Sequence, residues 1–141
     1  MKVFFQNENK DPGELFHRIE HACEGLVYIS ETDAPVLAFA ASPVDTVTAD
    51  VILQQAGLPA DSPVEERDFA EFFSRLTTIK DWYGEMETTR AKRFLELQKL
   101  LEESLRELKM FKVGQRRLDI FAVGIDKDER LMGITTKAVE T

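Results

Sequence analysis

The chain has 141 residues, of which 43% are hydrophobic and 31% are charged, a composition that excludes a disordered or fibrous protein. No apolar stretch approaches the roughly 18 residues that a membrane-spanning helix needs, and the polar residues after Phe5 argue against a secretory signal. The one cysteine, Cys23, excludes an internal disulfide and fits a reducing compartment. We therefore expect a cytoplasmic protein that does not bind membranes, with residues 1–10 as an N-terminal extension and 11–141 as a single domain.

The first half of the chain is predicted to contain three helices and one strand. Each helix is preceded by a residue whose side chain can cap its first backbone amides, and two of them stop at a glycine. The expected elements are a helix over 11–24 capped by Asp11 and ended by Gly25, a strand over 36–41, a helix from a Thr48 cap to Gly57, and a helix over 69–76 capped by Asp68.

The second half is predicted to begin with one long helix, over residues 84–108, followed by strands. Apolar residues recur in the helix at the spacing of one buried face: Phe94, Leu97, Leu101, Leu105 and Leu108. Strands are expected over 111–113, 118–125 and 131–139. The short turn over 126–130 makes the last two strands antiparallel. The sequence therefore predicts an α+β fold in which helices pack on a largely antiparallel sheet.

The net charge of −8 is unevenly distributed along the chain. Residues 11–89 contain 16 acidic and 4 basic residues, a net charge of −12, whereas residues 90–141 contain 9 acidic and 12 basic residues, a net charge of +3. Because an acidic surface repels phosphates, we expect no direct binding to nucleic acid. The negative charge can steer the chain toward a basic partner, or it can serve only to keep the protein in solution.

The residues His17-Arg18-Ile19-Glu20-His21 match the H-x-x-E-H pattern of one class of zinc protease. Two histidines four positions apart share a helix face, but the apolar residues around Ile19 place that face on the solvent side. A catalytic zinc needs three protein ligands in a cleft that excludes water, and no second motif offers the third ligand. We expect an exposed helix surface that could hold at most an adventitious metal.

The remaining enzyme signatures are weak or missing. Residues 126–129 carry alternating acids but lack the glycine and the later glutamate of a calcium loop, so they are predicted to form a solvated hairpin turn. Cys23 lies on an apolar helix face without a histidine positioned to activate it, and it is expected to be an inert core residue. The chain contains neither a glycine-rich phosphate loop nor a G-x-S-x-G elbow. We therefore predict no enzyme activity, no catalytic residues and no cofactor.

Three other places are less easily explained by folding alone. Glu31 lies in an acidic turn directly after the first helix. Asp81 precedes the only tryptophan, Trp82, in a connector, where the aspartate could cap the long helix and the tryptophan could cover an edge of the core. The last strand is followed at once by Thr141, which offers a hydroxyl and an α-carboxylate as recognition groups.

Several motifs resemble the nuclease A inhibitor (NuiA-like) family in collinear order over about residues 12–141. They are Glu24-Gly25-Leu26 through Ile29-Ser30-Glu31 and Pro35, then Phe72-Phe73-Ser74-Arg75, Thr77-Thr78 and Asp81-Trp82-Tyr83, then Val113-Gly114, Leu118-Asp119-Ile120 and Val123-Gly124, and finally Gly133-Ile134-Thr135-Thr136-Lys137 and Val139-Glu140-Thr141. A shared terminal residue after a shared last strand makes the resemblance specific.

The resemblance implies a single-domain α-β-α sandwich related in fold to pathogenesis-related protein 1. It also implies a protein that inhibits a sugar-nonspecific, Mg²⁺-dependent DNA/RNA endonuclease by binding at its active site. In that family the glutamate of the Ser-Glu turn and the terminal threonine reach the metal of the nuclease, and these positions correspond to Glu31 and Thr141. The Asp-Trp pair of the family interface corresponds to Asp81 and Trp82.

Two classes of function therefore remain open. The first is a monomeric protein inhibitor whose partner is a nonspecific nuclease and whose binding residues are Glu31, Asp81, Trp82 and Thr141, with no metal site of its own. The second is a small regulatory or ligand-binding domain that keeps the fold but has another partner. The two are distinguished by whether Glu31, Trp82 and Thr141 converge on one exposed surface; a hydrolase would instead need a three-ligand metal site at His17 and His21.

Overall fold

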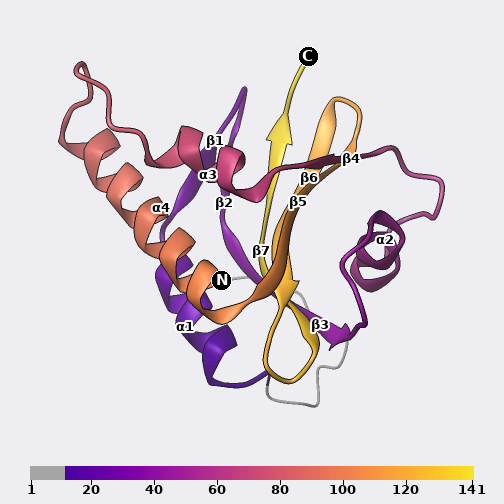
Figure 1. Cartoon of the computed structure of the whole chain (residues 1–141). Coiled ribbons are helices and arrows are strands. Elements are labelled where there is room, and N and C mark those ends of the chain that lie inside the picture. The colour runs from indigo at the N-terminus through magenta and orange to yellow at the C-terminus, as the bar shows by residue number, and fades with distance from the viewer. Residues whose placement is uncertain (1–11) are drawn as a thin grey trace.

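The computed structural model describes residues 12–141, so the predicted Asp11 cap and the N-terminal extension lie outside the described residues. Its elements, in chain order, are α1 (Glu14–Cys23), β1 (Val27–Ile29), β2 (Asp33–Pro35), β3 (Leu37–Pro43), α2 (Ala49–Ala56), β4 (Val64–Arg67), α3 (Phe69–Thr77), α4 (Glu85–Ser104), β5 (Arg106–Gly114), β6 (Arg117–Ile125) and β7 (Arg130–Val139). Five strands form one antiparallel sheet in the order β3-β7-β6-β5-β4, and β1 and β2 form a separate hairpin (Figure 1). The expected α+β fold with a largely antiparallel sheet is confirmed.

Helices lie on both sides of the five-stranded sheet. α1, α3 and α4 pack on one face, and α2 packs on the other (Figure 1). Side chains alternate along a strand, so successive residues of β3 point to opposite faces of the sheet. Ala38 and Ala40 belong to the core cluster beneath α1, α3 and α4, whereas Phe39 and Ala41 belong to the cluster beneath α2. The relation to pathogenesis-related protein 1 stays a prediction.

The helix ends follow local chemistry where a capping side chain is present. The Thr48 side chain accepts a hydrogen bond from the Val51 amide and begins α2, and that of Asp68 accepts one from the Glu71 amide and begins α3. Gly57 ends α2 in a left-handed conformation with φ of 70°, which glycine adopts without steric cost. These three predictions are confirmed. The α1 helix, in contrast, begins after Gly13 without a side-chain cap.

The predicted long helix over 84–108 is wrong in its last turn. α4 ends at Ser104, and β5 begins at Arg106. The register of β5 with β6 shifts between Arg106 and Lys109, where Glu107 has a positive φ of 56°. The carboxylate of Glu107 accepts hydrogen bonds from the Thr46 hydroxyl and the Val47 amide. The buried face of the helix is confirmed for Phe94, Leu97 and Leu101. Leu105 and Leu108 pack against the same core cluster although they lie outside the helix.

The sheet and its last hairpin agree with the prediction. β6 and β7 pair in antiparallel register from Arg117 with Val139 to Ile125 with Leu131, joined by the turn over 126–129. The short edge strand β4 was not predicted, because its sequence Val-Glu-Glu-Arg has three exposed polar residues and no alternating apolar pattern. Among residues 12–141, no helix combines the length and the apolar character that crossing a membrane requires.

Candidate functional site

The tip of the β1–β2 hairpin is held against the end of β7 by hydrogen bonds. The amide of Glu31 donates to the carbonyl oxygen of Val139 at 3.4 Å, and the amide of Val139 donates to the hydroxyl of Ser30 at 3.0 Å. Inside the tip, the Ser30 amide donates to the carbonyl oxygen of Thr32 at 2.9 Å. Two segments that are more than 100 residues apart in the chain therefore meet at one end of the molecule, where Figure 1 shows the C-terminus beside the hairpin.

Glu31 and Thr141 contact each other directly at this place. The amide of Thr141 donates to Oε2 of Glu31 at 2.8 Å, and its hydroxyl donates to Oε1 at 3.2 Å. Both residues are exposed, and they line a shallow depression with Tyr28, Ser30 and Glu140 among its other residues. Two of the four residues predicted as binding residues are thus brought together.

The Glu31 carboxylate remains able to bind a further group. Each of its oxygens accepts one hydrogen bond from Thr141, and a carboxylate oxygen has two lone pairs, so one acceptor position per oxygen remains. Within residues 12–141 no lysine, arginine or histidine forms an ion pair with Glu31. The site therefore presents hard oxygen atoms and an uncompensated negative charge to solvent, which suits a metal ion or a cationic group of a partner.

The second predicted pair, Asp81 and Trp82, lies in the loop between α3 and α4. The alternative in which Asp81 caps the long helix is wrong, because the residue before the helix is Gly84 and no side chain caps it. The alternative in which Trp82 covers an edge of the core is also wrong, because 72% of its surface is exposed. Its ring contacts Tyr83 edge to face at 4.8 Å and lies 5.8 Å from Nζ of Lys80, so it is ordered by neighbours in its own loop.

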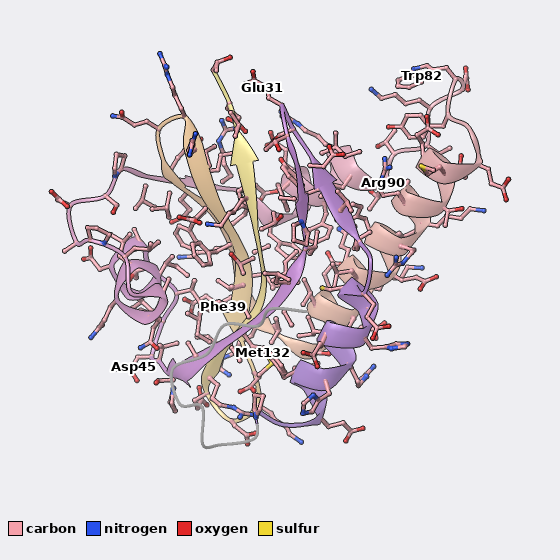
Figure 2. The ribbon with its side chains drawn as sticks, turned by 180° about the vertical axis from the view of Figure 1, so that it is seen from behind. Glu31, Phe39, Asp45, Trp82, Arg90 and Met132 are labelled. Carbon is pink, nitrogen blue, oxygen red and sulfur yellow. The ribbon has the colours of Figure 1, made fainter. Side chains whose placement is uncertain are left out.

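Exposed apolar side chains are concentrated at the same end of the molecule. Of the five large hydrophobic residues that are exposed within 12–141, four belong to the hairpin or to the segment around the α3–α4 loop: Ile29, Ile79, Trp82 and Met86. Figure 2 shows Glu31 and Trp82 at the same end of the molecule, with Arg90 of α4 below Trp82 in that view. A depression of about 690 Å³ is lined by residues 25–27, which lead into β1, and by the first turns of α4, including Met86 and Arg90.

The histidine motif forms no metal centre in the described part of the chain. His17 and His21 lie on the solvent side of α1, with side-chain exposures of 55% and 84%, and each lies beside a glutamate three residues further along. Residues 12–141 contain no group of three or more His, Cys, Asp or Glu side chains that could hold a metal ion. The expected exposed helix surface is confirmed.

Cys23 and the turn over 126–129 contribute to the fold rather than to a reactive or metal-binding site. Burial raises the pKa of the Cys23 thiol to about 12, so the reactive thiolate is not formed near neutral pH. The predicted hairpin turn is present, but Asp126 is 2% exposed rather than solvated. Its carboxylate accepts hydrogen bonds from the amides of Asp128 and Arg130 and pairs with the Arg130 guanidinium.

Sequence reasoning missed four residues of this surface. The hydroxyl of Ser30 links the hairpin to β7, and the exposed side chains of Ile29, Ile79 and Met86 extend the apolar surface around Glu31 and Trp82. The signal for Ser30 was the serine directly before the turn glutamate, a residue type that commonly bonds to nearby backbone. No pattern in the sequence distinguishes Ile29, Ile79 and Met86 from buried residues.

Comparison with protein families finds one match over nearly all of the described chain. The model of the family described as nuclease A inhibitor-like protein matches residues 13–141. No curated protein matches the chain. The matched range contains every residue of the candidate site.

Proposed function

The chain belongs to the nuclease A inhibitor-like family, and from that premise we propose that it binds a sugar-nonspecific, Mg²⁺-dependent endonuclease and blocks its active site. The observation that carries this proposal is the contact between Glu31 and Thr141 at an exposed end of the molecule, beside a cluster of exposed apolar side chains. The contact joins residues at opposite ends of the matched range. The Glu31 carboxylate accepts both of these hydrogen bonds from a residue 110 positions away and has no ion-pair partner within residues 12–141.

Glu31 and Thr141 act as oxygen donors toward the metal of the nuclease. Mg²⁺ prefers carboxylate and other oxygen ligands and keeps several water molecules, which exchange for ligands that a partner supplies. The carboxylate of Glu31 and the hydroxyl of Thr141 occupy the positions that the phosphate of a substrate and its attacking water would take. No three metal-ligating side chains cluster within residues 12–141, so in this proposal the nuclease provides the metal.

Trp82 and its neighbour Asp81 form a second contact region. A large aromatic side chain that is exposed in the free protein becomes desolvated in a complex, and such residues dominate binding energies. Ile29, Ile79 and Met86 surround the two regions with apolar surface that excludes water from them. The acidic part of the chain, residues 11–89, attracts a basic nuclease and brings it into contact.

The decisive experiment compares two exposed glutamates. Glu31→Gln removes the charge at the hairpin tip, and Glu66→Gln removes the charge of an exposed glutamate on the edge strand β4. Each variant is titrated into a Mg²⁺-dependent endonuclease that degrades both DNA and RNA, and the inhibition constant is measured. We expect Glu31→Gln to weaken inhibition by at least tenfold, the equivalent of about 1.4 kcal/mol, and Glu66→Gln to leave it unchanged.

Thermal unfolding is the control for both variants, because exposed positions away from special contacts change stability by less than about 0.5 kcal/mol. A wild-type protein that inhibits no nuclease of this class would overturn the proposal and favour a regulatory domain with another partner. Equal effects of the two substitutions would leave inhibition in place but remove Glu31 from its mechanism.

A further inference from the structure

We infer that Ser30 is a positioning residue, whose hydroxyl fixes the end of β7 so that Thr141 meets Glu31. Its effect on inhibition rests on the proposed function, whereas its effect on the order of Thr141 is a property of the free protein. The hydroxyl contacts both segments: it accepts a hydrogen bond from the Val139 amide at 3.0 Å and donates to the carbonyl oxygen of Thr32 at 3.0 Å.

The need for this hydroxyl follows from the geometry of the last strand. In an antiparallel ladder the N–H and C=O groups of one residue point to the same side of the strand. Both groups of Val139 bond to the hairpin: its amide to the Ser30 hydroxyl and its carbonyl oxygen to the Glu31 amide. The main sheet offers no backbone partner there, because β3 pairs with β7 only from Arg130 to Thr135. The Ser30 hydroxyl therefore accepts the hydrogen bond from the Val139 amide that a backbone carbonyl oxygen of a neighbouring strand would otherwise accept.

A serine hydroxyl can do this without leaving a polar atom unsatisfied. It has one proton and two lone pairs, so it donates to Thr32 while it accepts from Val139. The bond to Thr32 also holds the tip of the hairpin, where Glu31 is the next residue. One hydroxyl thus sets the position of the carboxylate and of the strand whose end must reach it.

The position of Thr141 depends on this anchor. Beyond Val139, the amide of Glu140 donates to the Arg116 carbonyl oxygen at 2.9 Å, and its carboxylate pairs with Nζ of Lys112 at 2.8 Å. Within residues 12–141, Thr141 itself bonds to the Glu31 carboxylate alone. If the Val139 anchor is lost, the last residues gain conformational freedom that must be lost again when a complex forms. Preorganisation of this kind raises affinity without adding a contact.

The test compares Ser30→Ala with Ser62→Ala as a matched control. Ser62 is likewise half-buried, and its hydroxyl also donates to a backbone carbonyl oxygen, that of Pro59, in the loop before β4. In the free full-length protein we measure the ¹H–¹⁵N heteronuclear NOE of the Thr141 amide, and in a nuclease assay the inhibition constant. We expect Ser30→Ala to lower the NOE and to weaken inhibition about fivefold, the usual effect of one hydrogen bond. Ser62→Ala and the hydroxyl-retaining Ser30→Thr should change neither.

A double-mutant comparison separates positioning from a general loss of structure. In a chain shortened by Thr141, the Ser30→Ala substitution should cost less than twofold in inhibition, because the residue that it positions is missing. Equal losses with and without Thr141 would overturn the inference, as would an unchanged NOE in Ser30→Ala. If the wild-type protein fails to inhibit, the proposed function fails, and the NOE still decides whether Ser30 orders Thr141.

Discussion

The β1–β2 turn and the β6–β7 turn both connect antiparallel strands, and both are rich in acidic residues. In the β6–β7 turn the acids are neutralised within the protein: Asp126 and Asp128 pair with Arg130, and Glu129 pairs with Arg106. In the β1–β2 turn, Glu31 and Asp33 are exposed and form no ion pair with a residue of 12–141.

The difference shows that acidic residues in a turn do not by themselves indicate a site. The carboxylate of Asp126 is buried and stabilises the turn that contains it, because two amides and one guanidinium occupy three of its four acceptor positions. The carboxylate of Glu31 instead bonds to Thr141, a residue far away in the chain, and keeps a free lone pair on each oxygen. The first arrangement serves the fold, and the second is available to a partner.

The largest expected effect is the loss of stability when Asp126 is replaced. Asp126→Ala leaves the amides of Asp128 and Arg130 without their acceptor and the half-buried Arg130 guanidinium without its buried partner. Removing one member of a buried pair typically costs about 3 kcal/mol, and the free energy of unfolding from urea titration measures it. Inhibition under folding conditions should not change. If the Asp126→Ala variant has the free energy of unfolding of the wild type but inhibits poorly, the comparison of the two turns is wrong.

The second effect is on binding alone. Trp82→Ala should weaken inhibition by about 2 kcal/mol or more, because the exposed indole is expected to be desolvated by the nuclease. Leu95, which is also exposed but lies on α4 outside the two contact regions, provides the matched control Leu95→Ala. Thermal unfolding should be nearly unchanged in both variants. If Trp82→Ala and Leu95→Ala bind the nuclease with equal affinity, the interface contains the hairpin but not the α3–α4 loop.

Local chemistry explains which parts of the fold were predictable. The caps at Thr48 and Asp68 act within three residues, so the sequence alone places the starts of α2 and α3. The end of α4 was missed because Leu105 and Leu108 keep the spacing of a helix face. Just beyond the helix end, the Glu107 carboxylate accepts hydrogen bonds from Thr46 and Val47, about 60 residues away in the chain, and no local pattern reveals these contacts.

The candidate site shows the same limit more strongly. Its residues were predicted by resemblance to a family, but nothing in the sequence indicates that Glu31 and Thr141 share two hydrogen bonds across 110 positions. The exposure of Trp82 could not be predicted either, because an isolated tryptophan in a connector is equally compatible with covering a core. Long-range geometry, rather than local pattern, determines which polar residues remain available.

The smallest expected effect is on the rate of association with a basic nuclease. It compares one acidic residue beside each of the two turns. Asp33→Asn removes an exposed charge that has no cationic partner within 12–141, whereas Asp128→Asn removes one that Arg130 already offsets. A unit charge at about 10 Å in water contributes roughly 0.4 kcal/mol, so Asp33→Asn should slow association with a basic nuclease about twofold at low salt. The difference should vanish at about 0.5 M salt, where screening shortens the range of surface charges below the size of the site. Asp128→Asn changes the net charge by the same amount but should slow association less, because the β6–β7 turn lies at the end of the molecule opposite the hairpin (Figure 1) and Coulomb interactions weaken with distance. Stopped-flow measurement of the association rate across this range tests both statements. An equal slowing by the two substitutions would mean that the net charge of the protein, rather than the charge near the hairpin, steers association.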